Sequence, residues 1–286
     1  MNNELAPGTD TGALQLQTIR WMLHATYRVS RPAAGRLCYR VLSRPPRKAP
    51  TDEEALFLAA AEQRTMVLNK MHIQVYHWPG KGPKVLLAHG WNSQSARWQI
   101  FGTQLQELGY DVYALDAPAH GQSTGRSFAL PFYAEAMNEL VLSIQPQAII
   151  GHSAGGMASI YFMHRYQQTP RPERLALIAT PAELTHFMDS FQRILGLKAG
   201  VMEELEREFS RRFKRSFSYF STAAFLEQLD RPGLIIHDEQ DDVAPVQGAH
   251  RMAKIWTESE LMLTQGLGHS VQHERVRERL LNWLES

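Results

Sequence analysis

The sequence predicts an α/β fold in which a mostly parallel sheet is flanked by helices. From residue 65 onward, short apolar segments alternate with segments of helical periodicity, a pattern typical of parallel strands covered on both faces. One apolar segment, residues 148–150, runs through Gly151 and Ser153 into a helix-compatible stretch, as a strand-to-helix turn requires. At 286 residues the chain can bury a large core, and we expect residues 1–286 to form a single domain.

Residues 1–63 are predicted to form a helical extension ahead of the sheet. Apolar residues recur at helical spacing over 16–27, and Pro32 should end this helix, because the residue before a proline is pushed out of the helical region. A second helix is expected over 33–43. A third is expected over 55–63, after a Thr-Asp-Glu-Glu capping box.

The same extension is rich in arginine. Two interpretations are open: the arginines lie on solvated faces of an amphipathic helical cover, or they contact a membrane surface or a partner. The arginines are Arg20, Arg28, Arg31, Arg36, Arg40, Arg44 and Arg47.

The core is predicted to comprise residues 64–180 and 231–286. Strands are expected over 65–69, 72–78, 84–89, 111–116, 148–150, 175–179, 233–237 and 261–263, and helices over 95–108, 131–144 and 154–166. Residues 181–230 show helical periodicity without a strand. This block predicts a helical cap above the carboxyl edge of the sheet, where ligands bind in open α/β sheets.

Composition restricts the class of protein. The formal net charge of +1 gives no argument for a nucleic-acid partner. The single cysteine, Cys38, excludes an intrachain disulfide and suits a reducing compartment. The first ten residues lack a basic signal region, and no apolar run approaches the roughly 20 residues that span a bilayer. We therefore expect a cytoplasmic protein without a transmembrane segment.

Ser153 is the candidate nucleophile. It stands at the centre of a Gly-x-Ser-x-Gly turn, in which a strained backbone projects the hydroxyl above the sheet. Gly151 and Gly155 occupy the positions where a side chain would collide across the turn. A serine hydroxyl also needs a base within hydrogen-bond reach and a group that orients the base.

The base and the acid are expected in two later loops. His269 follows the strand over 261–263 and is preceded by Gly266 and Gly268, which let the chain bring it across the sheet edge. An acidic loop follows the strand over 233–237, so the chain order is Ser, Asp, His. The candidate acids are Asp238, Glu239, Asp241 and Asp242. A divalent metal at this cluster is a rival interpretation, although nothing else indicates a metal site, and no cofactor is expected.

An oxyanion requires preorganised backbone donors. One is the amide of Ala154, which follows the nucleophile. The second is expected in the loop after the strand over 84–89, where Trp91 is the first choice and Asn92 the second.

Five ordered segments between residues 65 and 286 resemble the α/β-hydrolase superfamily. They are Leu86-Leu87-Ala88-His89-Gly90-Trp91, Asp116-Ala117-Pro118-Ala119-His120-Gly121-Gln122-Ser123, the Ser153 turn, the Asp241 loop and the His269 loop. The resemblance favours Asp241 as the acid, with Asp242 next. The second segment has Ala-Pro-Ala where an arginine and a glycine are common, so a substrate role of that arginine is not carried over. The N-terminal helices look like the extension of an uncharacterised bacterial subgroup, which indicates no substrate.

The resemblance implies a serine hydrolase that cleaves a carboxylic ester of a small-molecule acyl substrate through an acyl-enzyme. A serine nucleophile argues against dehalogenase and epoxide-hydrolase chemistry. Thioesterase, acyl transferase and C–C bond hydrolase chemistry stay open, as does a non-hydrolytic binding or signalling module on the same fold. The candidate substrate-binding residues are Asn92, His152, Phe187 and Phe191. The cap aromatics have two interpretations, which are a substrate pocket and cap-to-core packing.

Overall fold

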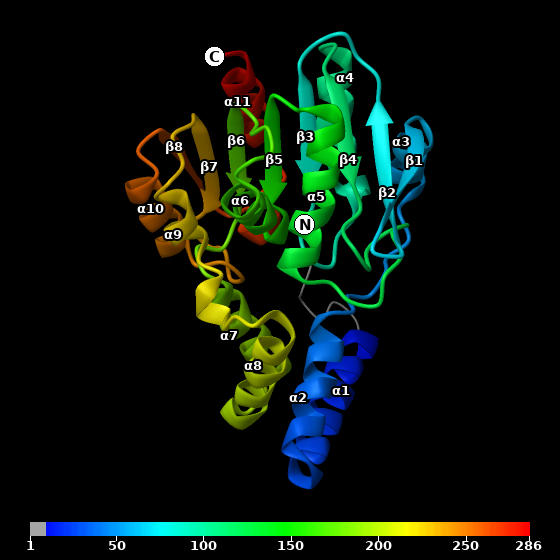
Figure 1. The fold of residues 1–286 in the computed structure, drawn as a ribbon, viewed down its shortest axis with the longest axis vertical. Coiled ribbons are helices and arrows are strands. Elements are labelled where there is room, and N and C mark those ends of the chain that lie inside the picture. The colour runs from blue at the N-terminus through cyan, green and yellow to red at the C-terminus, as the bar shows by residue number, and fades with distance from the viewer. Residues whose placement is uncertain (1–9) are drawn as a thin grey trace.

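A computed structural model describes residues 10–286 and contains one eight-stranded sheet in the order β1-β2-β4-β3-β5-β6-β7-β8 (Figure 1). The strands are β1 Glu62–Leu68, β2 Met71–Trp78, β3 Lys84–Ala88, β4 Asp111–Leu115, β5 Ala148–His152, β6 Arg174–Ile178, β7 Gly233–Asp238 and β8 Ser259–Thr264. The β1–β2 and β2–β4 pairs are antiparallel, and all other pairs are parallel. The prediction of a mostly parallel α/β sheet is confirmed.

Helices cover both faces of the sheet, because the central strands carry apolar side chains on both sides. In β3, Leu86 points into one core while Val85 and Leu87 point into the other. The first core lies beneath α5 Leu130–Ile144, α6 Ala154–Arg165 and α10 Val246–Ile255. The second lies beneath α3 Asp52–Ala59, η1 Ser95–Trp98, α4 Gln99–Glu107 and α11 Glu274–Glu285.

Helix α11 is not among the predicted elements. Its sequence carried the signal, because Val276, Leu280 and Trp283 recur at helical spacing and are buried in the second core. The His273 side chain caps the helix by accepting a hydrogen bond from the Arg275 amide at 3.2 Å.

The N-terminal helices follow the expected punctuation. Helix α1 spans Asp10–Val29 and α2 spans Arg31–Leu42, with Ser30 as the cap between them and Pro32 in the first turn of α2. Helix α3 begins at the capping box, in which Thr51 Oγ1 accepts from the Glu54 amide at 3.2 Å. The boundary expected at residue 63 is wrong by two residues, because β1 begins at Glu62 and pairs fully with β2.

The segment between β6 and β7 is helical and leaves the sheet at its carboxyl edge. It contains α7 Leu184–Leu195, α8 Ala199–Phe213, η2 Phe217–Tyr219 and α9 Thr222–Leu226. Helix α2 lies against α8, and a Cβ on Gly35 would overlap the Glu204 carbonyl. Figure 1 shows α1, α2, α7 and α8 together below the sheet. Helices α1 and α2 therefore form one layer with α7 and α8 over the carboxyl edge. No helix within residues 10–286 is long and apolar enough to cross a membrane.

Candidate active site

Ser153 occupies the sharp turn between β5 and α6. Its backbone has φ 52° and ψ −119°, a conformation that costs energy in a residue with a side chain. The turn is possible because a Cβ on Gly151 would lie 2.6 Å from the Gly156 Cα, and one on Gly155 would overlap the Ala88 carbonyl. The glycines thus allow α6 to start directly against the end of β3.

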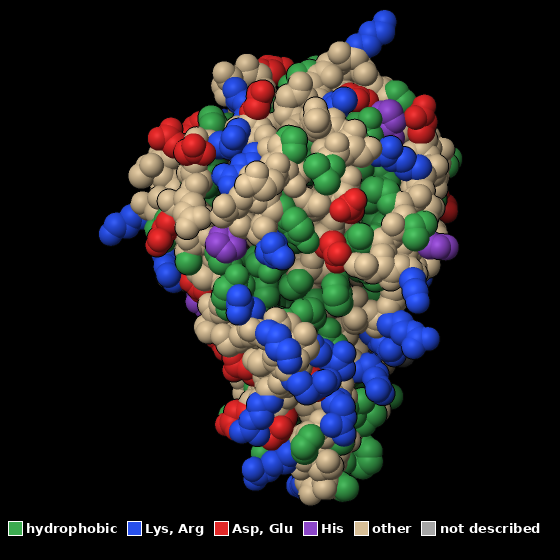
Figure 2. Space-filling model, in the orientation of Figure 1, with side chains coloured by type: hydrophobic (Ala, Val, Ile, Leu, Met, Phe, Trp, Pro, Cys, Tyr) green, Lys and Arg blue, Asp and Glu red, His purple; other side chains and the backbone are tan. Residues whose placement is uncertain are grey.

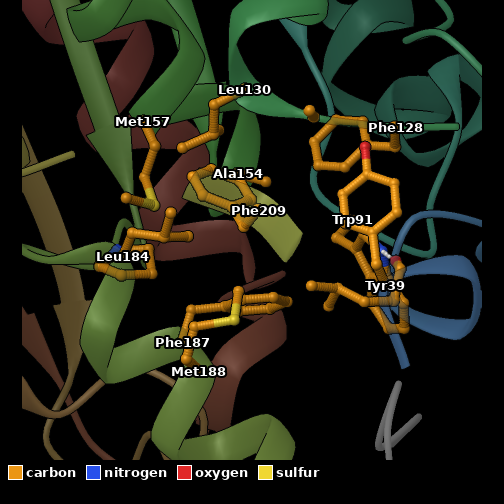
Figure 3. Close-up of a pocket in the computed structure, with 13 residues that line it drawn as sticks. Tyr39, Trp91, Phe128, Leu130, Ala154, Met157, Leu184, Phe187, Met188 and Phe209 are labelled. Carbon is orange, nitrogen blue, oxygen red and sulfur yellow. Dashed lines mark hydrogen bonds between the residues drawn. The ribbon is translucent and has the colours of Figure 1, made fainter. Parts of the chain in front are cut away.

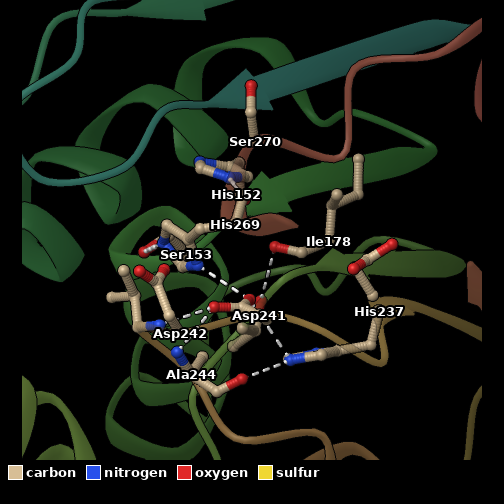
Figure 4. A network of polar contacts seen from close by, with 12 residues as sticks. His152, Ser153, Ile178, His237, Asp241, Asp242, Ala244, His269 and Ser270 are labelled. Atoms are coloured by element: carbon tan, nitrogen blue, oxygen red, sulfur yellow. Dashed lines mark hydrogen bonds and ion pairs between the residues drawn. The ribbon is translucent and has the colours of Figure 1, made fainter. Parts of the chain in front are cut away.

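The structure brings Ser153, His269 and Asp241 into one chain of hydrogen bonds (Figure 4). His269 Nε2 lies 2.9 Å from Ser153 Oγ, and His269 Nδ1 lies 2.8 Å from Asp241 Oδ2. The other carboxylate oxygen, Asp241 Oδ1, accepts the amides of Val243 and Ala244, both at 2.8 Å. This arrangement leaves Nε2 as the imidazole atom that can accept the serine proton.

The four candidate acids occupy different environments. The Asp241 side chain has no exposed surface, whereas Asp242 is exposed, and its backbone carbonyl accepts from Arg193. Asp238 accepts the Leu267 amide at 3.0 Å and so anchors the loop that carries His269. Glu239 accepts from Gln265. Within residues 10–286, no group of three or more His, Cys, Asp and Glu side chains converges as a metal site would require.

A second buried histidine touches the Asp241 carboxylate. His237 Nε2 donates to the Ala244 carbonyl at 2.7 Å and lies 3.4 Å from Asp241 Oδ2 (Figure 4). Burial lowers the pKa of His237, which keeps this imidazole neutral. A neutral His237 does not neutralise the Asp241 carboxylate, so that negative charge can stabilise a protonated His269.

The two expected oxyanion donors lie on either side of Ser153, with Trp91 in the loop after β3 and Ala154 at the start of α6. A Cβ on Gly90 would lie 3.0 Å from the Ser153 Cβ, so the loop after β3 passes directly beside the nucleophile. The amides of Trp91 and Ala154 have no hydrogen-bond acceptor within the described residues. The amide of Asn92, the second choice, instead donates to His120 Nε2 at 3.2 Å.

His152 lies behind His269 and not in a substrate pocket. Its Nε2 donates to the His269 carbonyl at 2.9 Å, and its Nδ1 accepts from Arg97 at 2.8 Å. Arg97 also donates to the Ser270 carbonyl at 3.2 Å. Burial holds the pKa of His152 well below its ordinary value, which fits a neutral ring with one donor and one acceptor nitrogen. The expected substrate contact is thus replaced by a contact that holds the His269 loop.

Arg97 was missed by the sequence reasoning. It lies 55 residues before His152 and 173 residues before Ser270, and no local motif marks it.

An apolar pocket opens beside the two oxyanion donors (Figure 3). Figure 3 shows Leu184, Phe187 and Met188 of α7 facing Tyr39 of α2 and Trp91 across the cavity. The cavity volume is about 40 Å³, within a wider apolar hollow that opens to solvent. The lining residues are Tyr39, Leu42, Trp91, Phe128, Ala129, Leu130, Ala154, Met157, Pro181, Leu184, Phe187, Met188 and Phe209.

Of the two phenylalanines that were expected to contact substrate, only Phe187 lines the pocket. Phe187 lines it and packs edge-on against Trp91, with ring centroids 6.0 Å apart. Phe191 is buried in the core and does not line the pocket. Tyr39 and Leu42 were not predicted as pocket residues, because they reach the pocket through tertiary contacts, namely the packing of α2 against α8 and the hydrogen bond from Trp91 Nε1 to the Leu42 carbonyl at 3.0 Å.

Solved structures share this fold at low sequence identity. An esterase of Pyrococcus furiosus has a TM-score of 0.64 at 16% identity, covering 86% of this chain and 97% of the esterase. A Butyrivibrio proteoclasticus protein solved with ferulic acid bound also has a TM-score of 0.64, at 17% identity, covering 78% of this chain and 100% of its own. The family model described as serine aminopeptidase, S33, matches residues 81–222. The chain belongs to the α/β-hydrolase superfamily.

Two curated relatives match shorter stretches at higher identity. An uncharacterized protein of Mycobacterium tuberculosis is 34% identical over 104 residues, which cover 35% of this chain and 30% of that protein. A pimeloyl-[acyl-carrier protein] methyl ester esterase of Stenotrophomonas maltophilia is 27% identical over 154 residues, covering 52% of this chain and 54% of the esterase. The chain thus spans under a third of the first relative's length and about half of the second's.

Proposed function

We propose that this protein is a serine hydrolase that cleaves carboxylic esters whose acyl group is apolar. The observation that carries the proposal is the hydrogen-bond chain Ser153–His269–Asp241 beside an apolar pocket that includes Trp91 and Ala154. The same pocket therefore holds the acyl group and brings its carbonyl to the nucleophile and to both amides. Esterases among the curated relatives support the reaction class.

In the first step Ser153 Oγ attacks the ester carbonyl carbon and its proton passes to His269 Nε2. The carbonyl oxygen becomes an oxyanion that accepts hydrogen bonds from the amides of Trp91 and Ala154. The start of α6 adds the positive end of a helix dipole at this point. When the intermediate collapses, the carbon–oxygen bond to the alcohol breaks, and His269 returns the proton to the leaving oxygen.

In the second step water hydrolyses the acyl-serine. His269 Nε2 takes a proton from water as the hydroxyl attacks the acyl carbon, and the proton then returns to Ser153 Oγ as the serine–acyl bond breaks. Asp241 stabilises the imidazolium in both steps, since its carboxylate is fully buried and accepts a hydrogen bond from Nδ1–H. The two amides at Asp241 Oδ1 hold the carboxylate in that orientation.

Labelling by a fluorophosphonate tests the nucleophile directly. We expect the wild-type protein to be labelled at Ser153, and the variant Ser153→Ala to lose labelling and p-nitrophenyl ester hydrolysis by about 10⁴-fold or more. The matched control is Ser159→Ala, which removes a buried hydroxyl on the same helix that donates to the Gly155 carbonyl. Turnover by S153A above a few per cent of wild type contradicts the proposal. Labelling without turnover of any ester or thioester would favour a non-hydrolytic module.

A further inference from the structure

From residue 13 onward, helices α1 and α2 and the segment after them carry charge of one sign. From residue 13 to residue 49 the sequence contains basic residues and no acidic residue, and every one of the basic side chains is exposed. Figure 2 shows Lys and Arg side chains gathered over the lower part of the molecule, where Figure 1 places these helices. The basic residues are Arg20, Arg28, Arg31, Arg36, Arg40, Arg44, Arg47 and Lys48.

Helix α2 directs part of this charge away from the protein. Its buried residues, among them Gly35 and Tyr39, face the helices that cover the pocket. Arg36 and Arg40 are four residues apart and lie on the opposite, exposed side. Arg44 follows the helix and is also exposed, and its Nε donates to the Arg126 carbonyl at 2.8 Å. By contrast, the arginines of α8 pair with glutamates of the same helix. The uncompensated charge is therefore that of α1, α2 and the segment that follows.

Helix α1 exposes large apolar side chains beside these arginines. Leu14 is 64% exposed, Trp21 is 72% exposed and Val29 is 89% exposed. Leu14 and Trp21 are separated by seven residues, or two helical turns, and Val29 follows two further turns along, so the three lie on one side of the helix. Exposed apolar side chains next to arginines are typical of helices that lie in a membrane interface.

This surface is continuous with the candidate active site. Helix α2 also provides Tyr39 and Leu42 to the apolar pocket. Arg47 and Lys48 line a separate polar hollow together with Ser270, which follows His269. A surface that holds α1 and α2 would therefore lie close to the entrance for an acyl chain.

We propose that the exposed side of α1 and α2 docks on an anionic lipid bilayer. Trp21, Leu14 and Val29 enter the headgroup region, and the arginines contact the lipid phosphates. The basic surface would attract any polyanion, including a nucleic acid. A nucleic acid, however, offers no apolar phase for Trp21, Leu14 and Val29. On the proposed function, the pocket then takes apolar acyl chains of esters that reside in the bilayer.

Vesicle flotation tests the docking without reference to catalysis. Full-length protein is mixed with vesicles of phosphatidylcholine alone or of phosphatidylcholine with phosphatidylglycerol. We expect binding to the anionic vesicles only, weakened by added salt. The double variant R36E/R40E should lower the partition coefficient at least about tenfold, and W21A should also lower it. Neither variant should change hydrolysis of a soluble short-chain ester.

The matched control is K81E/K254E, which changes the net charge equally at exposed positions outside α1 and α2. It should bind anionic vesicles within about twofold of wild type, since contact requires local charge. Equal loss in both double variants, or equal binding to neutral vesicles, overturns the proposal. So does a wild-type dimer that W21A dissociates without any vesicle binding, because the surface is then an interface between two copies. If the fluorophosphonate fails to label Ser153 in the wild-type protein, the proposed function is contradicted, but the vesicle-binding result still stands.

Discussion

Truncation of Phe187 should change which acyl chains the protein accepts. Phe187 forms part of the pocket wall opposite Tyr39 and contacts the Trp91 ring (Figure 3). The variant Phe187→Ala removes this part of the wall. We expect the loss to appear in kcat/KM for long acyl chains and to be small for acetate, which does not reach the wall.

The expected loss in kcat/KM follows from the number of methylenes that the Phe187 ring contacts. If the ring contacts about two methylenes, each worth about 0.8 kcal/mol, the loss is about 1.6 kcal/mol, or roughly 15-fold in kcat/KM for an octanoate ester relative to acetate. The assay is a series of p-nitrophenyl esters from acetate to octanoate, with the ratio of kcat/KM values as the readout.

Phe191 provides the control because it lies one turn further along α7 and is buried outside the pocket. The matched pair is F187L and F191L, which avoids the large cavity that alanine would leave in the core. F187L should shift the chain-length ratio, and F191L should leave it unchanged while lowering the melting temperature. A uniform loss across all chain lengths in the Phe187 variants refutes the reasoning and indicates that Phe187 acts only by supporting Trp91.

Three further predictions concern the surrounding framework. Arg97→Met should lower kcat about tenfold to a hundredfold for every ester with little change in KM, because the loop that holds His269 loses its contacts through His152; an unchanged kcat contradicts this. Gly35→Ala should lower the free energy of unfolding by about 1–3 kcal/mol in urea melts, because its Cβ overlaps the Glu204 carbonyl, whereas the neighbouring exposed Arg36→Ala should not. Burial lowers the pKa of His120 to about 3, so between pH 6.5 and 5 the unfolded chain binds a proton that the folded protein does not, and the free energy of unfolding falls as pH falls. His120→Asn should reduce that slope by about 1 kcal/mol per pH unit, and an identical slope counts against a neutral His120.

Much of the fold could be predicted because its signals are local. The apolar runs of β3 to β7 are short and continuous, as strands buried on both faces require, and Pro32 and the Thr51 capping box mark helix ends within a few residues. The Ser153 turn was evident for the same reason, since Gly151 and Gly155 meet steric demands within the turn and at the adjacent strand.

The acid that pairs with His269 and the residues that line the pocket could not be predicted from local signals alone. Asp238, Asp241 and Asp242 stand within five residues of one another, and spacing alone does not distinguish them. The family resemblance favoured Asp241, and its burial and partners in the folded chain show that it is the one that reaches His269. Phe187 and Phe191 share one apolar side of α7, so periodicity alone could not separate the pocket from the core.

The sequence by itself therefore determined the order of strands and helices, the turn at Ser153 and the segments that supply its partners. The tertiary structure decided which atoms meet. Arg97, His152 and Ser270 come together from three distant segments, and α2 closes the pocket only because Gly35 lets it approach α8. Such contacts depend on how the whole chain packs, and neither spacing nor composition along the chain encodes the distance between two packed surfaces.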